Sequence, residues 1–266
     1  MRLDRLLVER GHFSSRERAR EAIEVGLVEV VGRGILKPST LVGEHEPIIV
    51  RDADSAPVSR GYHKLCAALD EFGIEVAGRA CLDVGISTGG FTECLLERGA
   101  SRVCGVDVGK GQVDPRVLRD ERVCVLEGVN ARYLTREKVG FIPDIVTVDV
   151  SFISLKVVFP ALEGIGGPET SFIMLVKPQF EAGRGKAPKG IVRARDVHET
   201  VLRELRDFFA GRGFGVQACA SPIRGTKGNI EFFFHVRRGL PVASDSYLSH
   251  VVDVAHARQG REGVDI

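Results

Sequence analysis

Four charged residues of the sequence could share one reaction: Lys64, Asp149, Lys177 and Glu231. Asp149, Lys177 and Glu231 lie at or near ends of short apolar runs, and Lys64 lies on the helix expected just before the first run. Two amines and two carboxylates in one cleft could orient a hydroxyl group, take up its proton and stabilise the charge that develops on its oxygen. Because burial beside a second cation lowers the pKa of an amine, we expect Lys177 to act on the hydroxyl with Lys64 beside it. The two acids would hold both amines in place.

These residues can meet only if the apolar runs are strands of one sheet. Seven runs occur in the larger part of the chain: 80–84, 102–107, 123–126, 145–149, 172–177, 216–219 and 230–236. Most are separated by amphipathic stretches, which is typical of parallel strands covered by helices on both faces. Ligands of such sheets bind beyond the carboxyl ends of the strands. No long helix precedes the last run, so we expect it to be antiparallel and to bring Glu231 to the same edge.

The stretch from Ala80 to Gly99 indicates the ligand. A strand ends at Asp83, the turn G-I-S-T-G-G follows, and a helix begins after it. This turn has neither the G-x-G-x-x-G pattern of dinucleotide sites nor the Walker lysine. An acid directly before the turn would repel a phosphate and could hold an ammonium group, as S-adenosylmethionine has. A glycine-rich connection in an ordinary α/β domain remains an alternative reading of this stretch.

A second acid supports the cofactor interpretation. Asp107 ends the next run roughly 20 residues after Asp83, a spacing suited to hydrogen bonds with a ribose. Without a phosphate site before it, this pattern favours S-adenosylmethionine over NAD, with the adenine near the loop at 128–130. The expected cofactor-binding residues are Asp83, Gly85, Ser87, Thr88, Gly89, Gly90, Phe91, Asp107, Val108, Asn130 and Asp149.

Composition limits the possible partners. The 266 residues suffice for one large and one small domain, and 44% hydrophobic with 27% charged residues is typical of a soluble globular protein. Lys and Arg number 37 against 36 Asp and Glu, so binding to nucleic acid would require a local basic surface. No apolar run approaches the roughly 20 residues of a membrane span, and the start is not a signal peptide. The sequence contains no C-x-x-C pair of the kind that binds zinc. We therefore expect a cytoplasmic protein with no membrane partner and no metal.

The first fifty residues show a local basic surface of this kind. R-L-D-R-L-L-V-E-R-G and F-S-S-R-E-R-A-R-E-A-I-E-V-G-L-V-E-V resemble the S4 RNA-binding domain of ribosomal proteins and RNA-modifying enzymes. The resemblance implies binding of structured RNA. Its phosphate contacts would be Arg5, Arg16, Arg18 and Arg20, since the planar guanidinium binds two oxygens at once. Judged by charge alone, ordinary solvated helix faces are an equal alternative.

Six motifs follow in order: Lys64-Leu65, Asp83-Val84-Gly85, Thr88-Gly89-Gly90-Phe91, the segment V-D-V-S-F-I-S-L at 148–155, K-P-Q-F-E at 177–181 and G-N-I-E-F at 228–232. Together with the S4-like start they resemble the haemolysin A (TlyA-type) ribosomal RNA methyltransferases, which are relatives of the FtsJ-like 2′-O-methyltransferases. The resemblance implies methyl transfer to a cytidine 2′-hydroxyl of ribosomal RNA within a ribosomal subunit. It also implies a catalytic tetrad of Lys64, Asp149, Lys177 and Glu231.

The predicted fold is α/β: a class I S-adenosylmethionine-dependent methyltransferase domain, Rossmann-like, with a mainly parallel sheet and an antiparallel last strand. A small α+β S4 RNA-binding domain precedes it. The expected boundaries are 1–50 for the S4-like domain, 51–57 for a linker, 58–237 for the methyltransferase domain and 238–266 for a tail without strong pattern. Three alternatives remain: methylation of another RNA atom, a ribosome-binding protein without catalysis, and a haemolysin-like membrane-active protein.

Overall fold

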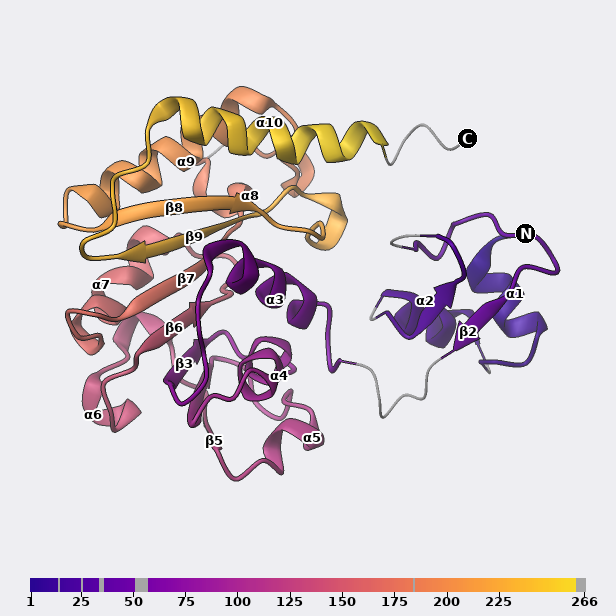
Figure 1. Cartoon of the computed structure of the whole chain (residues 1–266), viewed down its shortest axis with the longest axis horizontal. Helices are drawn as coiled ribbons and strands as arrows, with labels where there is room; N and C mark the ends of the chain where they lie inside the picture. Colours follow the sequence, from indigo (N-terminus) through magenta and orange to yellow (C-terminus); the bar gives the residue numbers. More distant parts are fainter. Residues whose placement is uncertain (14, 25, 34–35, 51–56, 184, 262–266) are drawn as a thin grey trace. The chain divides into compact units, whose positions relative to one another are not determined.

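The computed structural model describes residues 1–261 except 14, 25, 34–35, 51–56 and 184, and only the backbone of 17, 18, 21, 24, 226 and 258–261. The chain divides into two units, Met1–Tyr62 and His63–Ile266, which we describe separately (Figure 1). Most of the predicted linker at 51–57 lies outside the described residues, as does the end of the predicted tail.

The first unit packs two helices on a two-stranded sheet. Helix α1 (Leu3–Glu9) and helix α2 (Arg16–Glu24) precede the antiparallel strands β1 (Val28–Val30) and β2 (Ile48–Val50). Leucines at helical spacing on α1 are buried against alanines and an isoleucine of α2. The buried residues from both helices are Leu3, Leu6, Leu7, Ala19, Ala22 and Ile23. This apolar contact leaves the arginine-bearing faces of the helices outside the core.

The second unit contains a seven-stranded sheet. Its strands are β3 (Ala80–Val84), β4 (Arg102–Asp107), β5 (Val123–Glu127), β6 (Ile145–Val148), β7 (Ser171–Val176), β8 (Gly215–Ala220) and β9 (Phe232–Arg237). The spatial order is β5-β4-β3-β6-β7-β9-β8, and β9 pairs antiparallel with both of its neighbours while the other pairs are parallel. The predicted α/β fold with an antiparallel last strand is confirmed.

Helices cover both faces of this sheet. They are α3 (Gly61–Phe72), α4 (Gly90–Glu97), α5 (Pro115–Leu118), α6 (Arg136–Val139), α7 (Leu155–Ile165), α8 (Pro178–Glu181), α9 (Arg195–Ala210) and α10 (Asp245–Arg261), with 3-10 turns η2 (Ala131–Tyr133), η3 (Pro188–Gly190) and η4 (Thr226–Gly228). Successive side chains of β9 point to opposite faces of the sheet and contact different helix layers. Phe233 contacts Phe91 of α4, whereas Phe234 contacts Phe209 of α9.

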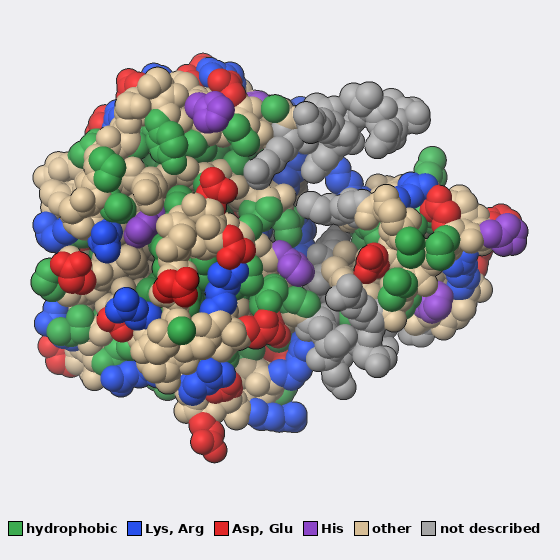
Figure 2. All heavy atoms as spheres, viewed as in Figure 1, with side chains coloured by type: hydrophobic (Ala, Val, Ile, Leu, Met, Phe, Trp, Pro, Cys, Tyr) green, Lys and Arg blue, Asp and Glu red, His purple; other side chains and the backbone are tan. Residues whose placement is uncertain are grey.

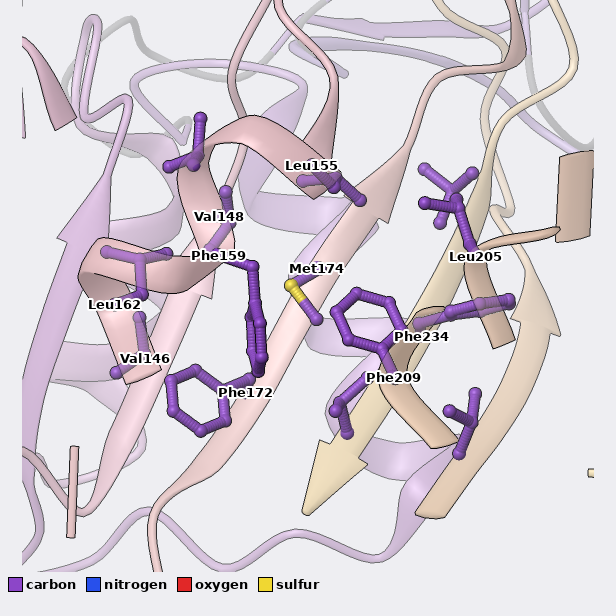
Figure 3. Close-up of a cluster of buried hydrophobic side chains, with 14 of the residues drawn as sticks. Val146, Val148, Leu155, Phe159, Leu162, Phe172, Met174, Leu205, Phe209 and Phe234 are labelled. Atoms are coloured by element: carbon purple, nitrogen blue, oxygen red, sulfur yellow. The ribbon is translucent and has the colours of Figure 1, made fainter. Parts of the chain in front are cut away.

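The core beneath α7 and α9 is aromatic. The ring of Phe159 lies 5.2 Å from that of Phe172 and 4.8 Å from that of Phe209, both in edge contacts (Figure 3). Such edge-to-face pairs add to the stabilisation that comes from burial itself. This packing fixes α7 on the sheet, and α7 begins just after the loop that follows β6.

Helix α10 occupies part of the predicted tail at 238–266, which shows no strong sequence pattern. It packs on α9 and β8 (Figure 1), through the buried residues Leu248, Val251, Val252 and Ala255. Figure 2 shows acidic and basic side chains interspersed on the visible face of the larger unit, consistent with a net charge near zero. None of the helices in the described part of the chain is long and apolar enough to cross a membrane.

Candidate active site

A cavity of about 490 Å³ lies at the carboxyl edge of the parallel strands. Its size is typical of sites that bind small molecules. The turn after β3, the end of β4 and the loops after β5 and β6 line it. Six predicted cofactor residues are part of this lining: Gly85, Ser87, Asp107, Val108, Asn130 and Asp149. Val129 and Ile153 add apolar surface suited to a flat ring.

Hydrogen bonds fix the shape of the turn against β4. The carboxylate of Asp107 accepts from the backbone N–H of Ser87 at 2.9 Å and from that of Gly109 at 2.8 Å. Gly85 has a φ of +88°, and a Cβ there would collide with the carbonyl oxygen of Asp149. Only glycine therefore lets the turn after β3 approach the end of β6 this closely.

The other five predicted cofactor residues do not line the cavity but lie in the turn or in the elements that it joins: Asp83, Thr88, Gly89, Gly90 and Phe91. Gly90 begins α4, and the Phe91 ring packs 6.1 Å from that of Phe233. Thr88 accepts a hydrogen bond from the backbone N–H of Asp114 through its carbonyl oxygen. These residues set where α4 begins.

Asp83 is fully buried. Its two carboxylate oxygens accept hydrogen bonds from the hydroxyls of Thr92, at 2.7 Å, and Thr147, at 2.9 Å. Burial raises its pKa to about 6, against the effect of these two hydrogen bonds. The side chain thus joins β3 to α4 and β6 from within the protein.

Lys177 and Asp149 form an ion pair at the edge of the cavity. The Lys177 Nζ lies 2.5 Å from Asp149 Oδ1 and donates a hydrogen bond of 2.9 Å to Ser151 Oγ. Asp149 comes directly after β6, and Lys177 comes directly after β7. Both side chains are largely buried, with 13% of the lysine and 25% of the aspartate exposed.

Lys64 and Glu231 form a second ion pair, which is more deeply buried. Lys64 Nζ donates to Glu231 Oε2 at 2.6 Å, and the residues are 8% and 3% exposed. Glu231 comes directly before β9, and Lys64 lies in the first turns of α3. A Cβ at residue 225 would collide with Glu231 Oε1, so Gly225 makes room for the carboxylate.

The sheet register brings the two ion pairs to neighbouring positions. Val176 pairs with Phe232 across β7 and β9. One residue further towards this edge, Lys177 therefore faces Glu231. Four residues from distant parts of the chain thus converge on one sheet edge, with each lysine next to a different acid.

Three residues of this region were not singled out from the sequence as site residues. Ser151 binds the Lys177 amine, and the half-buried carboxylate of Glu181 binds Ser154 and the backbone N–H of Leu155. Phe152 has a φ of +65° and is 90% exposed, with its ring 5.0 Å from that of Phe180. All of them stand in the V-D-V-S-F-I-S-L and K-P-Q-F-E motifs, so proximity to Asp149 and Lys177 was the available signal.

The predicted RNA-binding arginines differ in their partners. Arg5 pairs with Glu9 at 2.9 Å, and Arg16 pairs with Asp4 at 2.8 Å. Asp4 is buried and also binds Arg2, which sequence reasoning had not selected. Arg20 is exposed, and the side chain of Arg18 lies outside the described residues. Among the described residues, no group of three His, Cys, Asp or Glu side chains could hold a metal ion.

Comparison with known proteins relates this geometry to two domain families. Residues 57–238 match the model of the FtsJ-like methyltransferase, and residues 1–48 match that of the S4 domain. These two matches leave only a short segment between them.

Individual relatives are similar over nearly the whole chain. The 16S/23S rRNA (cytidine-2′-O)-methyltransferase TlyA of Mycobacterium tuberculosis is 46% identical over 243 residues, which cover 89% of each chain. Hemolysin A of Brachyspira hyodysenteriae is 38% identical over 238 residues, covering 88% of this chain and 99% of that protein. A solved structure from Streptococcus thermophilus, described as a hemolysin, has a TM-score of 0.76 at 36% identity and covers 98% of both chains.

Proposed function

Because the chain belongs to the FtsJ-like methyltransferase family and begins with an S4 domain, we propose that it methylates a cytidine 2′-hydroxyl of ribosomal RNA within a ribosomal subunit. The observation that carries this proposal is the Lys177–Asp149 ion pair at the mouth of the cavity. The name of the 46% identical Mycobacterium tuberculosis relative supports the choice of the cytidine 2′-oxygen. With a ribosomal substrate, the protein would act in the cytoplasm.

S-adenosylmethionine is the methyl donor of this family, so the cofactor prediction is confirmed. The cavity residues fit such a group. Asp107 offers carboxylate oxygens to ribose hydroxyls, while Val108 and Val129 offer apolar surface and Asn130 an amide to a purine. When bound, S-adenosylmethionine supplies an electrophilic methyl group on a sulfonium.

The tetrad supplies the groups that act on the acceptor hydroxyl. A ribose hydroxyl is a weak nucleophile at neutral pH and needs help in losing its proton. Lys177 Nζ takes up that proton as the oxygen forms its new bond to the methyl carbon. Asp149 then stabilises the resulting ammonium group at the distance that the structure shows. The Lys64–Glu231 pair lies at the same sheet edge, and its two opposite charges neutralise each other.

The first unit supplies the affinity for RNA in this proposal. Arg5 and Arg20 have exposed side chains, and Arg2 and Arg16 are held in place by the carboxylate of Asp4. Guanidinium groups oriented in this way suit bidentate contacts to phosphate oxygens.

The test is incubation of unmodified ribosomal subunits with labelled S-adenosylmethionine, followed by mapping of the labelled nucleotide. We expect label on a cytidine 2′-oxygen, loss of transfer in Lys177→Ala and unchanged transfer in the control Lys156→Ala, whose exposed side chain pairs with Glu204. Label on a base nitrogen or carbon would support the alternative target atom. Subunit binding without any label would support a ribosome-binding protein without catalysis.

A further inference from the structure

Two loops carry the groups that act on the hydroxyl, and they are joined at a second place. One loop runs from Asp149 to the start of α7, and the other runs from Lys177 through the short helix α8. Glu181, the last residue of α8, accepts a hydrogen bond of 2.6 Å from the Ser154 hydroxyl through Oε2. Its Oε1 accepts one of 2.8 Å from the backbone N–H of Leu155. A single carboxylate therefore bridges the loops.

This carboxylate adds to the local cap of α7, which Ser154 provides. The first N–H groups of α7 have no partner within the helix. The Ser154 hydroxyl oxygen accepts from the backbone N–H of Lys156 at 3.1 Å. Glu181 accepts from the Ser154 hydroxyl and from the backbone N–H of Leu155, the first residue of α7. A negative charge is favoured at this end of the helix. Unlike an ordinary cap, Glu181 belongs to another loop, so the network fixes the distance between the two loops as well.

Further contacts connect this bridge with the reacting groups. The rings of Phe152 and Phe180 lie 5.0 Å apart, one from each loop. Closer to the cavity, Lys177 donates to Ser151 and pairs with Asp149. From the bridge to the ion pair, the loops are thus in contact at three places. A displacement at Glu181 would be transmitted to the Lys177 amine.

We infer that Glu181 is a positioning residue for methyl transfer, because its carboxylate holds the loop after β7 against the start of α7 and thereby keeps Lys177 beside Asp149. This inference rests on the proposed function only for its kinetic readout. Burial raises the pKa of the Glu181 carboxyl group, and the hydrogen bonds from Ser154 and Leu155 oppose that rise. Replacing this half-buried carboxylate by an apolar group would leave the donors that it binds without a partner, which is costly.

The kinetic test compares Glu181→Ala, Glu181→Gln and Ser154→Ala in the full-length protein on unmodified ribosomal subunits. We expect Glu181→Ala to lower kcat by roughly tenfold to a hundredfold, since a displacement of about 1 Å has effects of this size. The KM for S-adenosylmethionine should stay within about twofold, because Glu181 is not part of the cavity lining. Glu181→Gln, which retains one acceptor oxygen, should recover part of the loss.

A double mutant and a matched control complete the kinetic test. Adding Ser154→Ala to Glu181→Ala should lower kcat little further, since both changes remove the same bridge. Glu204→Ala removes another glutamate near Lys156, one that is exposed on α9, and should leave kcat unchanged. Unchanged kcat in Glu181→Ala, or equal losses of kcat and cofactor affinity in it, would overturn the inference.

A crystal structure of Glu181→Ala gives a readout that does not depend on the substrate. We expect the distance between Lys177 Nζ and Asp149 Oδ1 to exceed about 4 Å, the usual limit of an ion pair. An ion pair preserved at 2.5 Å, as in the present structure, would refute the inference whatever the RNA target is. If the wild-type protein instead fails to methylate ribosomal RNA while the variant loses the ion pair, the proposed function fails and the positioning role stands.

Discussion

The buried ion pair between Lys64 and Glu231 allows stability and activity to be separated by mutation. Lys64→Met shortens the unbranched side chain by one atom and removes its charge. Glu231 is 3% exposed, and Lys64 Nζ, at 2.6 Å, is its side-chain partner. Removing one member of a buried pair leaves an uncompensated charge and typically costs about 3–5 kcal/mol. We therefore expect Lys64→Met to lower the free energy of unfolding by this amount.

Replacing both members should reverse most of that loss. In the double mutant Lys64→Met/Glu231→Met no charge is buried, and two apolar side chains of similar volume fill the space. Replacements of this kind are often neutral or stabilising. Methyl transfer should nevertheless be lost in the double mutant as in both single mutants, because the tetrad no longer has its second amine and acid.

The assay is denaturant unfolding of the full chain for the wild type, both single mutants and the double mutant, together with methyl transfer for each. The control cycle uses Lys156 and Glu204, an exposed pair at 3.1 Å, for which we expect a coupling of about 0–1 kcal/mol. The reasoning would be refuted if Lys64→Met cost less than about 1 kcal/mol. It would also be refuted if the double mutant were no more stable than Lys64→Met.

Other consequences can be measured independently. Asp107→Ala should weaken S-adenosylmethionine binding by about tenfold or more in calorimetry, because hydrogen bonds to a charged group contribute about 1.5–3 kcal/mol; equal affinity would place the ribose contact elsewhere. Burial lowers the pKa of His198 to about 4. Between these pKa values the unfolded state binds a proton that the native state does not. The free energy of unfolding should therefore be unaffected by His198 above about pH 6.5 and fall by up to about 3 kcal/mol as the pH is lowered towards 4. In His198→Gln this fall should be shallower. Deleting residues 1–51 should weaken binding to ribosomal RNA and reduce its dependence on salt concentration; an unchanged salt slope would show that the arginines of α1 and α2 do not contact phosphates.

Most of the sheet could be predicted from the sequence because its strands are short apolar runs that end in charged residues. Asp107 lies at the end of β4 and accepts hydrogen bonds from two backbone N–H groups at the cavity. Its position beside the turn could be predicted because it ends the strand that follows. Asp83 also stands near a strand end, but successive strand residues point to opposite faces. Its side chain enters the interior between Thr92 and Thr147. Position along a strand could be predicted, whereas the environment of the side chain depended on packing between elements.

Helix α10 shows a different limit. Leu248, Val251, Val252 and Ala255 repeat at helical spacing and are buried. The signal was present in the sequence, but the stripe is narrow and the surrounding residues are polar. Most of the stability of such a helix comes from packing on the rest of the fold. Here α9 and β8 supply that packing. The periodicity of α10 alone does not show which elements it will pack against.

The direction of β9 determines which of its charged residues lie at the carboxyl edge of the parallel strands. Because β9 is antiparallel to β7, its first residues lie beside Lys177 and bring Glu231 there. A parallel β9 would have brought Arg237 to this edge instead, adding a third cation in place of a second acid. The short connection before β9 was enough to predict its direction, but not which lysine each acid would bind. The structure pairs Lys64 with Glu231 and Lys177 with Asp149, so each amine lies next to its own carboxylate, and each pair can be removed separately by mutation.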